Sequence, residues 1–375
     1  MPLSIFVDAL PYTEMQSEYS EWFKNMQISK LIPNIAYSST LHWQLYCNKY
    51  PDDRGILVDW TRKPEKRKSV RIISTLLSPL DHCGDLGILS KKFLDRYVFR
   101  KNVFANIPYK FRNMFSEEGE YLFWNRETYG KEDIFKGYKV VSQDEGHISF
   151  DETIFRFNKA IEEKNKNIFV VLGFADGIGH KCRRGEVYSK RLKPCMDMLK
   201  DSIEKYIRNF PEEEVIVVSD HGMSTVKNKI DLNLEERFGK QNAKSYIAYS
   251  DTAVMCIWTD DEALKNNICE YLKTRTEGHL LDSADRERFG VTDENFGQII
   301  YILKEGNVFK NNWFGKSMRK PSPDGVGMHG FWPEWEAKDQ LASVILINGN
   351  EKLKESYTYR EAHSLIRKIM TGESI

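Results

Sequence analysis

The chain lacks most of the features that mark a membrane, exported or nucleic-acid-binding protein. Its longest strongly apolar run, 168–175, is far shorter than the roughly 20 residues that a membrane-spanning helix needs. Lysine and arginine total 55, and aspartate and glutamate also total 55, so the overall charge does not favour a nucleic-acid polymer as partner. No basic region followed by an apolar stretch opens the sequence, which predicts a cytoplasmic protein.

Cysteine is sparse and scattered. The chain has six cysteines and no CxxC pair, so the sequence shows neither a zinc ribbon nor a redox motif. With 41% hydrophobic and 29% charged residues, its composition excludes a disordered or fibrous chain. A chain of 375 residues is long enough to bury a sizeable core without disulfides or structural metals.

Nearly continuous apolar runs indicate strands that are buried on both faces of a sheet. Four such runs occur, at 5–7, 168–175, 215–218 and 342–347, and we interpret them as parallel strands. Segments with helical period lie between them: apolar residues follow one helical stripe over 188–206, and a shorter stripe covers 19–26. The alternation predicts an α/β fold, with a mostly parallel central sheet covered by helices on both faces.

Two long segments interrupt this alternation and divide the chain. We predict a catalytic core from residues 1–60, 166–235 and 325–375, an aromatic-rich cap at 61–165, and a second, smaller α+β insertion at 236–324. The second insertion has strand patterns at 253–258 and 298–303 and a helix pattern at 261–274. The aromatic rings of the cap either form a small second core or partly line a substrate cleft. The basic residues between 62 and 71 are either a solvated edge or a patch that attracts an anionic substrate.

Three of the apolar runs finish at or just before an aspartate. Asp8 follows IFV, Asp176 follows VVLGFA, and Asp220 follows VIVVS. A single aspartate in such a place is usually a helix cap or a turn residue. Because ligands gather at the carboxyl ends of parallel strands, three of them are expected to face one crevice.

Histidines accompany these aspartates. His180 comes four residues after Asp176 in ADGIGH, His221 directly follows Asp220 in SDHGMS, and His329 lies between glycines in GMHGF. Carboxylate and imidazole ligands without thiolate suit zinc, with manganese as the alternative. Three aspartates and three histidines would fill two metal sites of about three ligands each, an arrangement that suits phosphoryl transfer.

A nucleophile for such a site is available in the segment PNIAYSSTLHW. It offers Ser38, Ser39 and Thr40 just before a predicted helix, where the positive helix end favours an alkoxide and a phosphate. Hydroxyl side chains ahead of a helix more often act as caps. His42 lies one helical turn further on, and we interpret it as a packing residue. His82, His147, His279 and His363 have no partner pattern and are predicted to be structural or surface groups.

Taken in order, FVDALPY, PNIAYSSTLHWQLYCNKYPDDRGI, ADGIGHK, VVSDHGMS and GMHGFWP resemble the type I phosphodiesterase and nucleotide pyrophosphatase family of the alkaline phosphatase superfamily. The resemblance implies the alkaline-phosphatase-like fold with inserted cap segments. It implies that Asp176, His180 and His329 bind one metal. It also implies that Asp8, Asp220, His221 and Ser38 bind the second. The run from Ser38 to YPDDRGI matches the family without a gap, which favours Ser38 over Ser39 and Thr40 as the nucleophile.

The resemblance also implies an activity. We expect a hydrolase with two divalent metal ions that acts through a phosphoseryl intermediate on Ser38, and the substrate to be a small-molecule phosphate ester such as a nucleotide or nucleotide sugar. Many members use threonine as the nucleophile, whereas a serine is typical of the phosphomonoesterases of the superfamily. A phosphomonoesterase or phosphotransferase therefore stays an alternative, as does an inactive relative that binds an anion or a protein. The substrate-binding residues and the oligomeric state are not predicted.

Overall fold

The computed structural model describes residues 2–35, 38–58, 60–100, 103–104, 107–117, 132–143, 148–310, 314, 326–333 and 338–373. The chain forms two compact units. Unit 1 comprises residues 1–50, 121–226 and 325–375, and unit 2 comprises residues 51–120 and 227–324. None of the described helices combines the length and the apolar character that crossing a bilayer requires.

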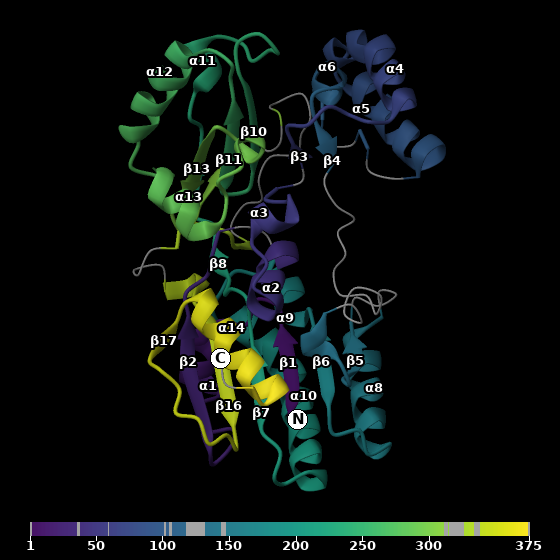
Figure 1. Cartoon of the computed structure of the whole chain (residues 1–375), viewed down its shortest axis with the longest axis vertical. Helices are drawn as coiled ribbons and strands as arrows, with labels where there is room; N and C mark the ends of the chain where they lie inside the picture. Colours follow the sequence, from purple (N-terminus) through teal and green to yellow (C-terminus); the bar gives the residue numbers. More distant parts are fainter. Residues whose placement is uncertain are drawn as a thin grey trace. The chain divides into compact units, whose positions relative to one another are not determined.

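Unit 1 is built on a seven-stranded sheet with the strand order β17-β2-β16-β7-β1-β6-β5 (Figure 1). Its strands are β1 (Leu3–Val7), β2 (Met26–Leu31), β5 (Lys139–Ser142), β6 (Ile168–Leu172), β7 (Val215–Val218), β16 (Ala342–Ile347) and β17 (Ser356–Tyr357). The neighbours β5, β6, β1 and β7 run parallel, and β17 runs parallel to β2. This confirms the predicted α/β class with a mostly parallel sheet.

Helices cover both faces of this sheet (Figure 1). They are α1 (Tyr12–Glu18), α2 (Ser38–Cys47), α8 (Phe150–Glu162), α9 (Phe174–Gly179), α10 (Glu186–Asn209) and α14 (Tyr359–Thr371), with short helical turns η3 (Asp133–Phe135) and η6 (Lys338–Gln340). Alternation along β1 assigns the faces: Ile5 and Val7 pack in the cluster that includes α8 and α10. Phe6 points the other way and meets the ring of Tyr46 on α2 edge-on, at 6.3 Å between centroids. Residues that alternate along one strand therefore build two cores.

Three predicted elements of unit 1 differ in the structure. The strand expected at 168–175 ends at Leu172, because the chain turns there into α9. The helix expected at 19–26 is absent: α1 ends at Glu18, and Met26 already belongs to β2. The strand β16 occupies the predicted residues but is antiparallel to both β7 and β2. The apolar composition of a buried strand does not encode its direction.

The C-terminal part of the predicted cap belongs to the central sheet and its covering helices. Within 61–165, β5 pairs in parallel with β6, and α8 buries Ile154, Phe157 and Ile161 in the core of unit 1. These are the edge strand and a covering helix of the sheet, and their apolar residues have the ordinary periods for both roles. The domain boundaries predicted from the sequence thus differ from the limits of the compact units. The cap aromatics Tyr121, Phe123, Trp124 and Tyr129 lie outside the described residues.

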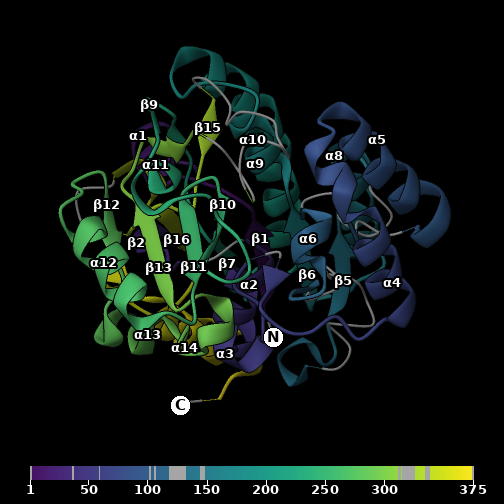
Figure 2. The same ribbon diagram turned by 90° about the horizontal axis from the view of Figure 1, so that it is seen from above.

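Unit 2 contains a four-stranded antiparallel sheet with the order β10-β11-β13-β12 (Figure 2). The strands are β10 (Ile247–Asp251), β11 (Val254–Trp258), β12 (Gly278–Leu280) and β13 (Ile299–Leu303), and β9 (Asn228–Ile230) pairs separately with β14 (Asn307–Phe309). The accompanying helices are α11 (Leu234–Phe238), α12 (Glu262–Lys273) and α13 (Ser283–Phe289), with the turn η4 (Glu294–Phe296). The two strand patterns and the helix pattern of the second insertion correspond to β11, β13 and α12.

The remaining part of unit 2 is largely helical. It contains α3 (Pro51–Arg54), β3 (Trp60–Thr61), α4 (Lys68–Leu77), η1 (Ser78–His82), α5 (Asp85–Phe93), the π-helical segment η2 (Leu94–Phe99), α6 (Tyr109–Arg112) and β4 (Ser116–Glu117). Val70, Val103, Phe104 and Tyr109 form its small buried core. Beside it, the fully buried guanidinium of Arg112 pairs with Glu65 at 2.5 Å and donates to the carbonyl of Val103 at 2.8 Å.

Replacing Glu65 with glutamine is expected to lower the free energy of unfolding by about 3 kcal/mol, because the buried Arg112 loses its carboxylate partner. Burial alone would raise the pKa of Glu65, but hydrogen bonds from Arg67 and the charges of Arg112 and Arg67 lower it to about 2. The folded pKa thus lies below the ordinary value of 4.5. The stabilisation is therefore present above that pH and is lost as the pH falls towards the folded pKa.

Urea unfolding at neutral and acid pH measures both effects. The exposed pair of Asp260 with Arg62, at 2.8 Å, provides the matched control in the same unit. Asp260→Asn is expected to change stability by less than about 1 kcal/mol. Equal losses in the two variants would show that the burial of the Glu65–Arg112 pair does not matter.

Candidate active site

The three predicted aspartates lie at the carboxyl ends of three adjacent strands of unit 1. Asp8 directly follows β1, Asp220 comes two residues after β7, and Asp176 lies in the first turn of α9 after β6. Because β1 is the strand between β6 and β7, these ends are neighbours in the sheet. The backbone joins them further: the amide of Asp176 donates to the carbonyl of Asp8 at 3.2 Å.

One group of ligand atoms comes from Asp176, His180 and His329, which lie within 4.8 Å of one another. Asp176 Oδ1 lies 3.0 Å from His180 Nε2 and 3.6 Å from His329 Nε2. His329 reaches the site because β15 (Gly327–Met328) pairs antiparallel with β8 (Ser224–Thr225), a few residues after His221. The rings of His329 and His221 stack at 3.7 Å between centroids.

The second group gathers around His221. Its Nε2 lies 2.8 Å from Ser38 Oγ, 3.4 Å from Asp220 Oδ2 and 3.5 Å from Asp8 Oδ1. Asp8 and His221 also lie within 4.8 Å of Asp176 in their ligand atoms, so Asp176 belongs to both groups, whereas the sequence predicted it for the first alone. The structure thus brings all seven predicted residues together in unit 1. Whether they bind metal stays a prediction.

Backbone carbonyls fix the orientation of two histidines. His221 Nδ1 lies 2.8 Å from the carbonyl of Gly222, and His180 Nδ1 lies 3.1 Å from the carbonyl of Gly327. A carbonyl only accepts, so each Nδ1 donates its proton to the carbonyl and Nε2 is the ring nitrogen that faces the carboxylates. This is the arrangement typical of histidines that ligate a metal through Nε2.

The donor set fits divalent cations. Asp220 Oδ2 and His329 Nδ1 are buried and have no hydrogen-bond partner among the residues that the structure describes. A buried carboxylate oxygen that faces an imidazole lone pair is unfavourable unless a cation lies between them or the ring is protonated. Two carboxylates near His221 and one near His180 and His329 therefore present the oxygen and nitrogen ligands that zinc prefers.

The side chains of the site respond differently to burial. Burial opposes ionisation of Asp176, but the hydrogen bond from His180 and the nearby charge of His329 lower its pKa to about 2. Burial raises the pKa of Asp220. Burial and the neighbouring His221 lower the pKa of His329 well below its ordinary value. Ionising the buried side chains of Asp220 and His329 therefore costs free energy unless a counterion is near. Asp176, in contrast, is held as a carboxylate.

Several supporting residues have no signal in the sequence. The hydroxyl of Tyr359 on α14 donates to the carbonyl of Asp220, and Ser219 Oγ donates to the carbonyl of His221 at 2.9 Å. Gly222 is required by close packing, since a Cβ there would lie 2.4 Å from the carbonyl oxygen of Asp339. These contacts hold the turn that carries Asp220 and His221. The contacts of Tyr359 with Asp220 and of Gly222 with Asp339 join residues that are distant in sequence, so no local pattern reveals them.

Other charged and histidine side chains have structural roles. Arg184, close to His180, pairs with Glu14 and, at 2.8 Å, with Asp339. It is therefore committed to ion pairs within unit 1. His363 lies 2.9 Å from the carbonyl of Leu45, and His279 pairs with Asp285 at 2.6 Å in unit 2. His42 is buried in α2, and His147 lies outside the described residues.

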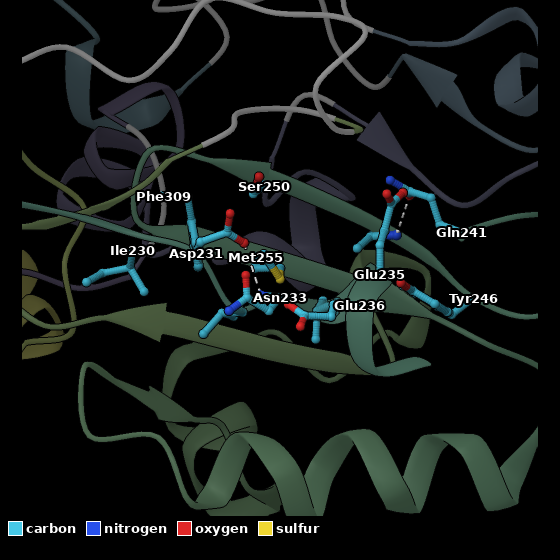
Figure 3. A pocket seen from close by; sticks show the side chains of 13 residues that line it. Ile230, Asp231, Asn233, Glu235, Glu236, Gln241, Tyr246, Ser250, Met255 and Phe309 are labelled. Carbon is cyan, nitrogen blue, oxygen red and sulfur yellow. Dashed lines mark hydrogen bonds between the residues drawn. The ribbon is translucent and has the colours of Figure 1, made fainter. Parts of the chain in front are cut away.

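A separate pocket of about 210 Å³ lies within unit 2 (Figure 3). Carboxylates of Asp231, Glu235 and Glu236 line it beside the apolar side chains of Leu232 and Phe309. None of the seven predicted residues is among those that line this pocket. The site described above is therefore distinct from it in both residues and chemistry.

Solved structures with the same fold include a nucleotide pyrophosphatase/phosphodiesterase and a phosphonoacetate hydrolase. Murine ectonucleotide pyrophosphatase/phosphodiesterase 5, an inactive variant in complex with AMP, is 14% identical with a TM-score of 0.59, over 99% of this chain and 94% of that chain. Phosphonoacetate hydrolase from Sinorhizobium meliloti 1021, in complex with phosphonoformate, is 11% identical with a TM-score of 0.61, over 99% of this chain and 95% of that chain. At these identities the likeness establishes the fold.

Sequence comparisons give the family. A comparison with curated proteins finds no significant match. The profile of the type I phosphodiesterase/nucleotide pyrophosphatase family matches residues 37–332, which is well over half of the chain. The chain therefore belongs to this family of the alkaline phosphatase superfamily and is a phosphoester hydrolase of the phosphodiesterase and pyrophosphatase type.

Proposed function

We propose that the protein is a two-metal phosphodiesterase or pyrophosphatase that uses Ser38 as its nucleophile. The observation that supports this best is the position of Ser38 Oγ, 2.8 Å from His221 Nε2 at the carboxyl ends of the central strands. Ser38 is also the first residue of α2, whose amino end favours negative charge on the serine oxygen and on a phosphate. A capping role alone would not explain why this hydroxyl lies among carboxylates and imidazoles.

Two groups of residues would hold the metals. Asp176, His180 and His329 form one set, and Asp8, Asp220, His221 and Ser38 form the other. Divalent cations, zinc or alternatively manganese, would favour the ionised serine oxygen and neutralise the phosphoryl oxygens. Asp8, Asp176 and His180 keep side-chain exposed fractions of 18%, 24% and 35%, so solvent and a small substrate can reach this end of the site.

The chain's own residues define the chemical step. Ser38 Oγ loses its proton to solvent and attacks phosphorus, a new O–P bond forms, and the bond from phosphorus to the leaving oxygen breaks. The products are a phosphoryl-serine that keeps the second ester group of a diester, and an alcohol or a phosphate that takes up a proton from solvent. Water then attacks phosphorus of this intermediate and the bond from phosphorus to Ser38 Oγ breaks. The product leaves as a phosphate monoester, and a proton from the water restores the serine hydroxyl. His221 and His180 stay oriented throughout by the carbonyls of Gly222 and Gly327.

The substrate class is proposed to be a small phosphate diester or a pyrophosphate, such as a nucleotide or nucleotide sugar. Of the structures with the same fold, one holds AMP and another holds phosphonoformate, and both are small phosphorus-containing anions. The second candidate is a phosphomonoesterase or phosphotransferase, which the serine at position 38 favours. An inactive relative is disfavoured because all seven positions hold competent residues.

Turnover of bis-nitrophenyl phosphate and mono-nitrophenyl phosphate separates the two candidates. The protein is first stripped with a chelator and then reloaded with zinc or with manganese. We expect the diester to have at least about a tenfold higher kcat/KM than the monoester, and no turnover of either before reloading. A higher kcat/KM for the monoester would identify a phosphomonoesterase. Full turnover in the stripped protein would contradict the metal requirement.

A further inference from the structure

Large apolar side chains are exposed mainly in one part of unit 2. Ten such side chains are exposed among the described residues, and seven of them lie between 72 and 98: Ile72, Leu76, Leu86, Leu89, Phe93, Tyr97 and Val98. Their exposed fractions run from 52% to 71%. Scattered exposed apolar residues are normal, but their concentration in one short segment marks an interaction surface.

The exposed residues of α5 and η2 form a continuous stripe. Leu86, Leu89 and Phe93 follow one another at helical spacing along α5, and the ring of Tyr97 on η2 packs against Phe93 at 5.1 Å between centroids. The opposite side of the segment serves the small core of unit 2, to which Leu94 and Phe99 contribute. The exposed stripe is therefore separate from the apolar side chains that this segment buries in the core of unit 2.

The exposed charges of the segment that carries this stripe are mainly of one sign. Six cationic residues between 66 and 100 are exposed, namely Lys66, Lys68, Arg71, Lys92, Arg96 and Arg100, against a single exposed carboxylate, Asp85. The other carboxylates of the region are directed inward: Asp81 pairs with Lys91 at 2.7 Å, and Asp95 accepts from the amide of Phe104 at 2.8 Å. The exposed charges of the segment 66–100 are thus mainly cationic, and Lys92 and Arg96 lie next to Phe93 and Tyr97 in the sequence, although the whole chain has a net charge of zero.

We propose that the stripe of α5 and η2, formed by Leu86, Leu89, Phe93 and Tyr97 and flanked by Lys92 and Arg96, binds peripherally to an anionic phospholipid surface. A helix with leucine and aromatic side chains on one side and lysine and arginine beside them can lie in the interfacial plane of a bilayer. The apolar side chains enter the boundary between headgroups and acyl chains, and the cations meet the lipid phosphates. This surface goes beyond the proposed hydrolysis, which does not require it.

A second copy of the chain is a poorer occupant for this stripe. A symmetric dimer places the same patch of both subunits face to face. Lys92 and Arg96 of one copy would then lie close to the same cations of the other, and like charges in an interface oppose association. An anionic lipid surface would bury the same apolar side chains and would also supply negative charge for Lys92 and Arg96.

Co-sedimentation of the full chain with vesicles tests the proposal. Phosphatidylcholine vesicles with phosphatidylserine are compared with phosphatidylcholine alone, at low and at high salt. We expect binding to the phosphatidylserine vesicles only, weakened by salt. Leu89→Ser with Phe93→Ser, and separately Lys92→Glu with Arg96→Glu, should each lower the partition coefficient about tenfold or more.

Matched controls exist outside the stripe. Phe155→Ser changes an exposed phenylalanine of α8, and Lys190→Glu with Arg191→Glu reverses two exposed charges of α10. These controls should bind vesicles like the parent, and every variant should keep its turnover of a soluble phosphate ester. The proposal is overturned by equal binding to neutral vesicles, or by unchanged binding of the stripe variants. It is also overturned if the parent binds no vesicles and instead self-associates through Leu89 and Phe93.

Discussion

Ser38→Ala is expected to reduce kcat by at least about 10³-fold, because it removes the proposed nucleophile. The variant should still bind two metal ions per chain, since the three aspartates and three histidines are unchanged. Metal content after gel filtration, measured beside turnover, separates a loss of chemistry from a loss of binding. In the parent, a rapid acid quench during turnover should trap the substrate's phosphoryl group on a peptide that contains Ser38.

Ser39→Ala is the matched control for this prediction, because it removes the neighbouring hydroxyl that the sequence also offered. It should retain turnover within a few-fold of the parent. Full activity of Ser38→Ala, together with inactivity of Ser39→Ala, would assign the nucleophile to Ser39. A loss of both metals in Ser38→Ala would show that the serine acts mainly in assembling the site.

Asp220→Asn is expected to reduce turnover by at least about 10²-fold and to lower the metal content from two ions to one. The amide can keep the hydrogen bonds that Asp220 Oδ1 accepts from the amides of Ala9 and His221, at 3.3 Å and 3.0 Å. It replaces Oδ2, the oxygen that faces His221 Nε2, with an NH2 group that cannot bind a cation.

Asp220→Asn is expected to lower activity but not to lower the free energy of unfolding of the metal-free protein. Burial raises the pKa of Asp220, so the metal-free fold loses stability as the pH rises above the ordinary carboxyl value of 3.8. At neutral pH the metal-free variant should therefore be at least as stable as the metal-free parent, and this advantage should vanish in acid. Thermal unfolding with and without zinc measures both. Asp197→Asn, an exposed carboxylate on α10, is the control and should change neither quantity.

Periodicity and composition predicted the central elements of unit 1 well. The limits of β7 and β16 are those of the apolar runs 215–218 and 342–347, and α10 contains the helical stripe 188–206. The convergence of Asp8, Asp176 and Asp220 follows from the same reasoning, because adjacent parallel strands end at one edge of a sheet. Here the local sequence and the tertiary structure carry the same information.

Tertiary context decided what the sequence could not. The direction of β16 depends on which strands it pairs with, and its apolar side chains suit either direction. The residues of β5 and α8 have ordinary strand and helix patterns, but nothing local shows that they extend the sheet of unit 1. The contacts of Tyr359 with Asp220 and of His180 with Gly327 join residues that are far apart in the chain. Hydrogen bonds of this kind, from residues outside the seven, orient the side chains of the site.

The most direct test of the two-metal site is a crystal structure of the zinc-loaded protein with anomalous scattering recorded on both sides of the zinc edge. We predict two anomalous peaks in unit 1, one contacted by Asp176, His180 and His329 and the other by Asp8, Asp220, His221 and Ser38. A zinc-loaded, active crystal without a peak between these side chains would contradict the account.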